Sequence, residues 1–259
     1  MSAQRPTAPW TAWRPDDYFR DYYSAEVQPD EREAIRFQAD FLQRAGQLFP
    51  TALEYGCGPT LMRAIAAAKY VRSLHLADYL ESNLSRVRQW ASGDGNACDW
   101  SAFTRYVLQC EGVARPGPAD VLAREGLTRK VITDLLPTDA REPYPLGEHR
   151  AERYDLLITG FCVEAVSESK AVWRSCLANV FGLLKRGGSF VLAAVRRCKG
   201  YRVGECWFPA ADIDLADLGP ALLECGCDPA LLRLEERDLP AHDSQGYHGI
   251  LLASGRKLA

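Results

Sequence analysis

The stretch Leu53 to Thr60 reads L-E-Y-G-C-G-P-T, an apolar run that ends in an acid and then in two closely spaced glycines. Glycines after a strand let the backbone approach a ligand, and the helix that follows offers free N–H groups. A lone pattern of this kind is weak, because many short glycine pairs are ordinary turns. A phosphate-binding loop would add a third glycine or a Gly-Lys-Ser/Thr ending, whereas Pro59-Thr60 follows Gly58 here. The loop therefore favours an adenosyl ligand over a pyrophosphate.

Two further apolar runs also end in an acid. Ser73 to Asp78 is the first and Lys130 to Asp134 is the second. In a doubly wound α/β fold, a strand-end carboxylate in the position of Asp78 accepts both ribose hydroxyls. Taken singly, Asp78 fits a helix N-cap and Asp134 fits a turn equally well. Three strand-end acids in chain order predict a nucleoside site.

The elements that position these acids alternate between strand and helix periodicity, which predicts a Rossmann-like α/β domain over residues 1–259. Its sheet is mostly parallel, with an antiparallel edge, and residues 1–28 form an irregular, aromatic segment that covers the site. Residues 92–128 are expected to pass over the sheet edge with one short helix. We expect strands near 51–55, 72–77, 129–133, 153–159, 189–195, 201–207, 230–237 and 247–254, and helices near 30–48, 100–111, 168–184 and 212–226, with two more ending near 70 and 91.

Composition excludes several classes. The 259 residues carry a formal charge of -3, which gives no basic footprint for nucleic acid. No apolar run is long enough for a membrane span or a signal peptide. The nine cysteines are odd in number and scattered, without metal-ligand spacing, so we expect reduced thiols, no metal and a cytoplasmic protein. No obligate protein partner is evident.

Several short motifs of the sequence resemble those of one family, the nicotinamide, phenylethanolamine and thioether (indolethylamine) methyltransferases that use S-adenosylmethionine. They occur in family order from about residue 10 to the C-terminus. The resemblance implies a class I methyltransferase fold, an N-terminal lid and S-adenosylmethionine as cofactor. The matching motifs are Asp17–Tyr23, Gly56–Thr60, Asp78-Tyr79 with Asn83, Asp99-Trp100-Ser101, Phe161–Ser167, Lys185–Gly188 and Tyr201–Glu205.

The resemblance also implies a set of cofactor-binding residues. The two glycines of the loop would face the methionine part, Asp78 the ribose and Asp134 the adenine amino group. Leu135 would offer its backbone, and Thr159 with Gly160 would line the thioether end. The full set is Tyr18, Tyr23, Gly56, Gly58, Thr60, Asp78, Tyr79, Asn83, Asp134, Leu135, Thr159 and Gly160.

For the acceptor, the resemblance implies an aromatic box with carboxylates, which suits an amine. Its members are Tyr22, Phe161, Glu164, Tyr201 and Glu205, of which Glu164, Tyr201 and Glu205 are the candidate catalytic residues. Glu164 fits a helix cap equally well, Glu205 fits a solvated edge residue, and the N-terminal tyrosines fit a half-buried aromatic face.

The chain departs from the family at two acceptor-binding carboxylates, where Ala194 and Cys198 stand, and Met62 replaces an aromatic residue near the cofactor. Neither the nicotinamide nor the phenylethanolamine substrate can therefore be carried over. The expected reaction is transfer of a methyl group to nitrogen in a small amine, amidine or heteroaromatic acceptor. Methyl transfer to sulfur and a non-catalytic cofactor-binding module are the alternatives.

Overall fold

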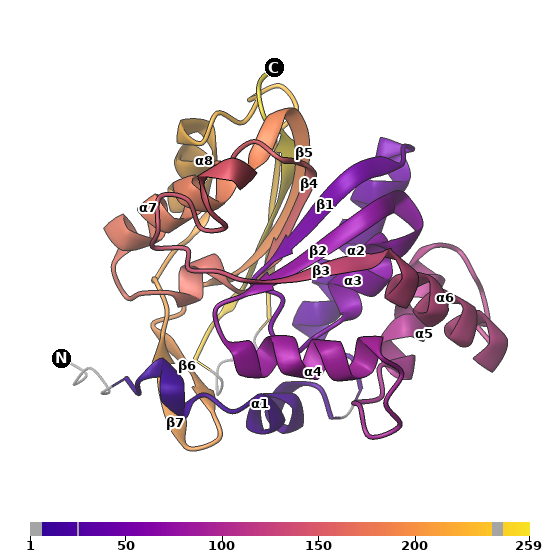
Figure 1. Cartoon of the computed structure of the whole chain (residues 1–259). Coiled ribbons are helices and arrows are strands. Elements are labelled where there is room, and N and C mark those ends of the chain that lie inside the picture. The colour runs from indigo at the N-terminus through magenta and orange to yellow at the C-terminus, as the bar shows by residue number, and fades with distance from the viewer. Residues whose placement is uncertain (1–6, 25, 240–245) are drawn as a thin grey trace.

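A seven-stranded sheet forms the centre of the computed structural model, which describes residues 7–24, 26–239 and 246–259 (Figure 1). The strand order is β3-β2-β1-β4-β5-β9-β8. The first five strands run parallel, while β9 pairs antiparallel with β5 and with β8. This confirms the predicted Rossmann-like sheet with an antiparallel edge. The strands are β1 (Phe49–Tyr55), β2 (Val71–Asp78), β3 (Ile132–Pro137), β4 (Tyr154–Gly160), β5 (Leu184–Arg196), β8 (Arg233–Asp238) and β9 (Gly249–Arg256).

Helices cover both faces of the sheet, so the central strands are buried on both sides and read as continuous apolar runs (Figure 1). One core cluster contains Ile35 and Leu42 of α2, and the other contains Trp173 and Leu177 of α7. The helices on the first face are α2 (Pro29–Ala45), α3 (Met62–Ala67), α4 (Glu81–Ala91), α5 (Ser101–Cys110) and α6 (Pro118–Val131), and those on the second are α7 (Lys170–Phe181) and α8 (Leu215–Glu224).

The segment 92–128 differs from the prediction, because it holds α5 and most of a second helix, α6. Pro118 begins α6, and the Asp120 carboxylate accepts the N–H of Gly117 at 2.8 Å. The helix continues through Val131 with no break before β3. The expected strand at 129–133 is therefore wrong: β3 begins at Ile132 and ends at Pro137, which moves its carboxyl end past Asp134.

A small hairpin stands apart from the main sheet, formed by β6 (Gly200–Val203) and β7 (Cys206–Pro209), where a single strand near 201–207 was expected. It lies against α1 (Pro15–Tyr22) and the residues before that helix (Figure 1). Three hydrogen bonds join the two segments: the Ala8 N–H donates to the Trp207 carbonyl, the Gly204 N–H to the Asp21 carboxylate and the Tyr22 hydroxyl to the Arg202 carbonyl. We call residues 8–23 with the hairpin the roof.

Two aromatic side chains of the roof are buried in the fold. Tyr23 is only 6% exposed and packs on Trp100 and Phe103, with ring centroids 5.8 Å apart in both pairs. Trp13 is also 6% exposed and lies 4.8 Å from the ring of Tyr18. Residues 1–6 and 25 of the expected lid segment lie outside the described residues. No helix in the described part of the chain is long and apolar enough to cross a membrane.

Candidate active site

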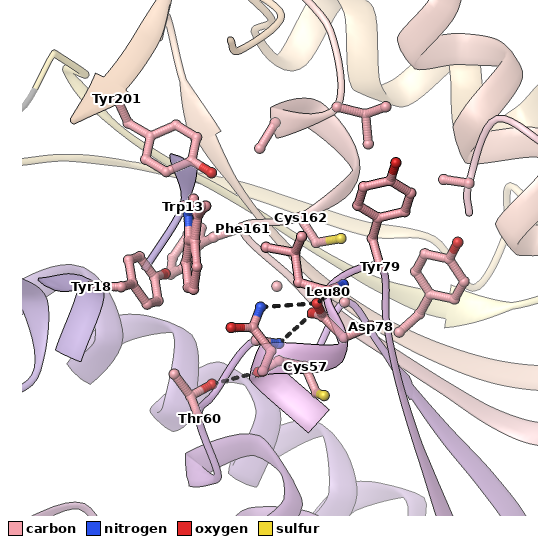
Figure 2. A pocket seen from close by; sticks show the side chains of 18 of the residues that line it. Trp13, Tyr18, Cys57, Thr60, Asp78, Tyr79, Leu80, Phe161, Cys162 and Tyr201 are labelled. Atoms are coloured by element: carbon pink, nitrogen blue, oxygen red, sulfur yellow. Dashed lines mark hydrogen bonds between the residues drawn. The ribbon is translucent and has the colours of Figure 1, made fainter. Parts of the chain in front are cut away.

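A pocket opens at the carboxyl ends of β1, β2, β3 and β4, beneath the roof. Loops after parallel strands meet at this edge of an open α/β sheet, where ligands bind. Figure 2 shows side chains from these loops and from the roof pointing into one space, with Asp78 and Cys57 on one side and Trp13, Tyr18 and Tyr201 on the other. The pocket thus has a polar end and an aromatic end.

The glycine loop after β1 forms the floor of the polar end. Gly56 and Gly58 take positive φ values of 70° and 59°, which favour glycine. A Cβ on Gly56 would lie 1.9 Å from the Sγ of Cys162, so only glycine fits between the ends of β1 and β4. Both glycines and Thr60 line the pocket, and the Thr60 hydroxyl donates to the Cys57 carbonyl (Figure 2).

Asp78 at the end of β2 organises this end of the pocket. One carboxylate oxygen accepts the Gly58 N–H at 2.8 Å, and the other accepts the Leu80 N–H and the Asn83 amide at 2.9 Å each (Figure 2). Burial raises the pKa of Asp78, and these hydrogen bonds oppose the rise. Asn83 is 3% exposed, and its Oδ1 has no hydrogen-bond donor among the described residues. That buried acceptor beside Asp78 fits a ligand hydroxyl group such as those of a ribose.

The acid after β3 that reaches the pocket is Asp139, whereas Asp134 was expected there. Asp134 lies inside β3, opposite His75 of β2, and forms an ion pair with Arg150 at 3.3 Å. Asp139 follows the true end of the strand and accepts three hydrogen bonds from the Arg141 guanidinium, at 2.7 to 3.1 Å. The sequence signal for Asp139 is the proline that ends the apolar run, Pro137, with the acid two residues later.

Two more expected cofactor contacts lie outside the pocket lining. Leu135 pairs with Leu76 within the sheet. Because β3 continues to Pro137, neither Leu135 nor Asp134 lies at the pocket. Thr159 is 3% exposed and its hydroxyl is enclosed without a partner among the described residues. Its neighbour Gly160 does line the pocket, as do Tyr18, Tyr23 and Tyr79.

The aromatic end is formed by residues far apart in the sequence. Phe161 comes from the loop after β4 and Tyr201 from the hairpin (Figure 2). Tyr22 comes from α1, and all three line the pocket as predicted. Four residues at this end were not among the expected site residues: Asp30, Tyr247 and two tryptophans. Asp30 is 8% exposed and accepts the Tyr247 hydroxyl at 2.7 Å. The composition of the start of the chain was a signal, because exposed rings need a partner; the additional aromatic members are Trp10, Trp13 and Tyr247.

Glu164 and Glu205 do not line the pocket, contrary to the expectation of a carboxylate box built on them. Glu164 is 2% exposed, and its carboxylate accepts the N–H of Val195 at 2.8 Å. Its backbone carbonyl accepts the Ala211 N–H at 2.7 Å, so the residue ties three segments together. Glu205 is exposed in the turn between β6 and β7. Both glutamates therefore have structural positions.

Glu164 should make the stability of the protein depend on pH. Burial raises its pKa to about 7, although the Val195 N–H opposes the rise. A carboxyl whose folded pKa lies above its unfolded pKa stabilises the fold fully below the unfolded value, and loses that contribution as the pH rises through the folded value. Through this carboxyl the wild type should lose roughly 3 kcal/mol of unfolding free energy between pH 4.5 and 8. The Glu164→Gln variant should not show this loss. Urea unfolding at several pH values measures this.

The matched control is Glu205→Gln, which removes the same charge from an exposed turn and should leave the pH dependence unchanged. A Glu164→Gln variant whose unfolding free energy falls as steeply with pH as that of the wild type would contradict the assignment. Because Glu164 does not line the pocket, we expect kcat/KM of Glu164→Gln to stay within about threefold of wild type.

The glycine loop, the strand-end acids and the sheet order define an S-adenosylmethionine-dependent methyltransferase of Rossmann-like fold. A profile of the NNMT/PNMT/TEMT family matches residues 5–258, and the chain belongs to that family. Indolethylamine N-methyltransferase of Mus musculus is 27% identical over 228 residues, which cover 82% of this chain and 84% of the relative. Nicotinamide N-methyltransferase of Sus scrofa is 26% identical over 219 residues, 83% of this chain and 82% of the relative.

Solved structures agree on the fold. N-methyltransferase NodS from Bradyrhizobium japonicum superposes with a TM-score of 0.56 at 17% identity, covering 90% of this chain and 98% of that one. Magnesium protoporphyrin IX methyltransferase from Synechocystis, solved with the cofactor bound, gives a TM-score of 0.58 at 13% identity, covering 95% and 93%. These identities are low, so the likeness carries the fold and not the acceptor.

Proposed function

We propose that this methyltransferase transfers the methyl group to a nitrogen of a small acceptor with an apolar or aromatic body. The observation that carries the proposal is the aromatic end of the pocket, which adjoins the cofactor loop and holds one acid, Asp30. Aromatic faces bind an apolar body and attract a cation, and a carboxylate accepts an amine N–H. The relatives named as N-methyltransferases support the same reading.

The cofactor residues divide the ligand between them. Asp78 and Asn83 fit the ribose hydroxyls, Asp139 fits the adenine amino group, and the Gly56–Gly58 loop fits the methionine end. The cofactor, when bound, supplies an electrophilic methyl group on a sulfonium. In-line displacement needs little acid or base help, so the protein's main task is to hold the acceptor nitrogen in line and exclude water. The roof performs that task here, with Trp13, Tyr18 and Tyr201 around the acceptor.

Asp30 gives the acceptor end its charge. A protonated amine must lose a proton before its lone pair can attack, and a buried carboxylate hydrogen-bonded to that nitrogen holds it in place while the proton leaves. Asp30 is held by the Tyr247 hydroxyl and lies at the start of α2, below the roof. In this proposal Asp30 has the role that was expected of Glu164.

Methyl transfer to sulfur is the second candidate. It gains support from the positions of Glu164 and Glu205, because a pocket without those two carboxylates suits an uncharged thioether or thiol better than the expected box did. A non-catalytic cofactor-binding module has less support, since the cofactor residues and the aromatic end meet in one pocket.

Asp30→Asn tests the choice between nitrogen and sulfur. Transfer of label from the cofactor to a panel of amines, heteroaromatic nitrogens and thioethers would identify the acceptor. For an amine we expect Asp30→Asn to lower kcat/KM about ten- to hundredfold, because a charged hydrogen-bond partner is lost, while cofactor affinity stays unchanged. Glu205→Gln, with an equal loss of charge outside the pocket, should match wild type. Turnover of thioethers alone, unaffected by Asp30→Asn, would contradict transfer to nitrogen.

We further propose that the protein is cytoplasmic and that its binding partner is the small-molecule acceptor. All nine cysteines are free thiols in the structure. Disulfides are rare in the cytosol and common in secreted proteins, so a protein with many unpaired cysteines fits a reducing compartment. Fractionation of cells that express the chain would test the location.

A further inference from the structure

Arg63, the second residue of α3, is a buried cation with unused hydrogen-bond donors. Its side chain is 7% exposed and lines the pocket. A guanidinium has five N–H donors, yet the only hydrogen bond of this one among the described residues runs from Nη2 to the Glu31 carboxylate, at 3.0 Å. The Nε and Nη1 atoms have no hydrogen-bond partner among the described residues, yet neither is fully enclosed by protein. Both are therefore accessible from the pocket.

A second buried arginine in the same fold shows what a purely structural pair is like. Arg124 of α6 is 7% exposed and lies outside the pocket. It binds Glu111 through two parallel hydrogen bonds, of 2.9 and 2.5 Å, and donates a third to the Ile65 carbonyl at 3.2 Å. Arg63 meets its own glutamate through one nitrogen only. Since buried charged groups are normally fully hydrogen-bonded, the difference points to a ligand at Arg63.

The surroundings of Arg63 define the kind of ligand. The guanidinium lies against Gly160, where a Cβ would come within 2.0 Å of Nε, and its carbon lies 5.1 Å from the centroid of the Phe161 ring. Burial lowers the pKa of Arg63, but its interactions with neighbouring acidic groups, Glu31 first, outweigh burial and raise it above its ordinary value. The group is thus a fixed cation at the junction of the glycine loop and the aromatic end. A planar carboxylate matches its fork of donors.

We propose that Arg63 binds the carboxylate of the cofactor's methionyl end. The glycine loop that would face that end leads directly into α3, so Arg63 is close to it along the chain and in the pocket. A carboxylate on the acceptor would offer the same chemistry, and binding measured without acceptor distinguishes the two sources. The proposal rests on the cofactor class and not on the identity of the acceptor.

The same residue connects the cofactor to the roof. Glu31, which binds Arg63, also accepts the hydroxyl of Tyr23 at 2.9 Å, and the Tyr23 hydroxyl lies 3.2 Å from that of Tyr18. The chain of contacts therefore runs from the pocket through Arg63 and Glu31 to α1. A carboxylate that fixes Arg63 also fixes Glu31 and, through it, the two tyrosines. In this way the amino-acid end of the cofactor stabilises the closed roof.

The test compares S-adenosylhomocysteine with S-adenosyl-3-thiopropylamine, which lacks the carboxylate, by calorimetry without acceptor. We expect the wild type to bind the first at least tenfold more tightly. Arg63→Met alone leaves Glu31 buried and unpaired, so the main variant is Arg63→Met with Glu31→Gln, which keeps an acceptor for Tyr23. In this variant the two ligands should bind within about twofold of each other. Arg63→Lys keeps the charge without the fork and should give an intermediate ratio.

The matched control is Arg124→Met with Glu111→Gln, which removes a buried ion pair outside the pocket. It should lose stability and keep the wild-type ratio. Hydrogen exchange of residues 15–23 supplies a second readout: S-adenosylhomocysteine should protect them and the decarboxylated ligand should not. Equal binding of the two ligands by the wild type, or a wild-type ratio in the folded Arg63 variant, would overturn the proposal. Both readouts are independent of turnover, so a wrong acceptor leaves them unaffected.

Discussion

Asp78→Ala should reduce the affinity for S-adenosylhomocysteine by at least a hundredfold, about 3 kcal/mol. The carboxylate is the proposed ribose partner, and it also holds the Gly58 and Leu80 N–H groups and the Asn83 amide in place. Its removal leaves a ligand hydroxyl and three protein donors without their acceptor, and each unsatisfied buried group costs about 1 to 3 kcal/mol. Calorimetry on the folded variant measures the effect.

Asp134→Ala is the matched control for that experiment. Asp134 is the same residue type on the neighbouring strand, but it pairs with Arg150 outside the pocket, so its loss should leave the affinity within about twofold of wild type. An Asp78→Ala protein that is folded and still binds the ligand as tightly as Asp134→Ala would show that the cofactor is placed wrongly.

Deletion of residues 1–24 should reduce kcat/KM by about a thousandfold or more. It removes one whole wall of the aromatic end, and holding reactants in a closed, aligned geometry is worth about 7 to 11 kcal/mol in favourable cases. The pocket loses Trp10, Trp13, Tyr18, Tyr22 and Tyr23. Steady-state kinetics with the acceptor identified by the label-transfer panel would measure the loss.

The same deletion should also lower the melting temperature, because the segment adds buried rings to the core. Tyr23 packs into the main core cluster beside Trp100, and exposing such rings costs several kcal/mol in total. Deletion of residues 1–6 is the control, because it leaves every named roof residue in place. A protein that lacks residues 1–24 yet turns over at the wild-type rate would show that the aromatic residues are only structural.

Much of this arrangement could be predicted because it depends on local patterns. The Gly56–Gly58 loop and Asp78 each follow an apolar run that is buried on both sides, and such runs are readable one at a time. Phe161 and Tyr201 were placed in the pocket because they lie in motifs that resemble those of the family. The structure brings both to the same end of the pocket.

The rest depends on features that no short window contains. No glycine or proline marks the point where α6 becomes β3, between Val131 and Ile132. The strand was therefore placed early and its final acid was misidentified. Glu164 was placed near the correct loop, but its carboxylate meets the Val195 N–H of β5, 31 residues further along the chain. Arg63 and Glu31 are 32 residues apart and meet only in the folded protein.

The hydrogen bonds that join residues 8–22 to the hairpin at 200–209 also determine when the aromatic end can form during synthesis. The contact between Tyr22 and Arg202 spans 180 residues, so residues 8–22 leave the ribosome long before the hairpin on which they pack. Until then Trp10 lacks Phe208, on which it stacks at 5.3 Å in the finished fold. The acceptor end is thus assembled late, on a sheet whose first five strands precede the hairpin in the chain.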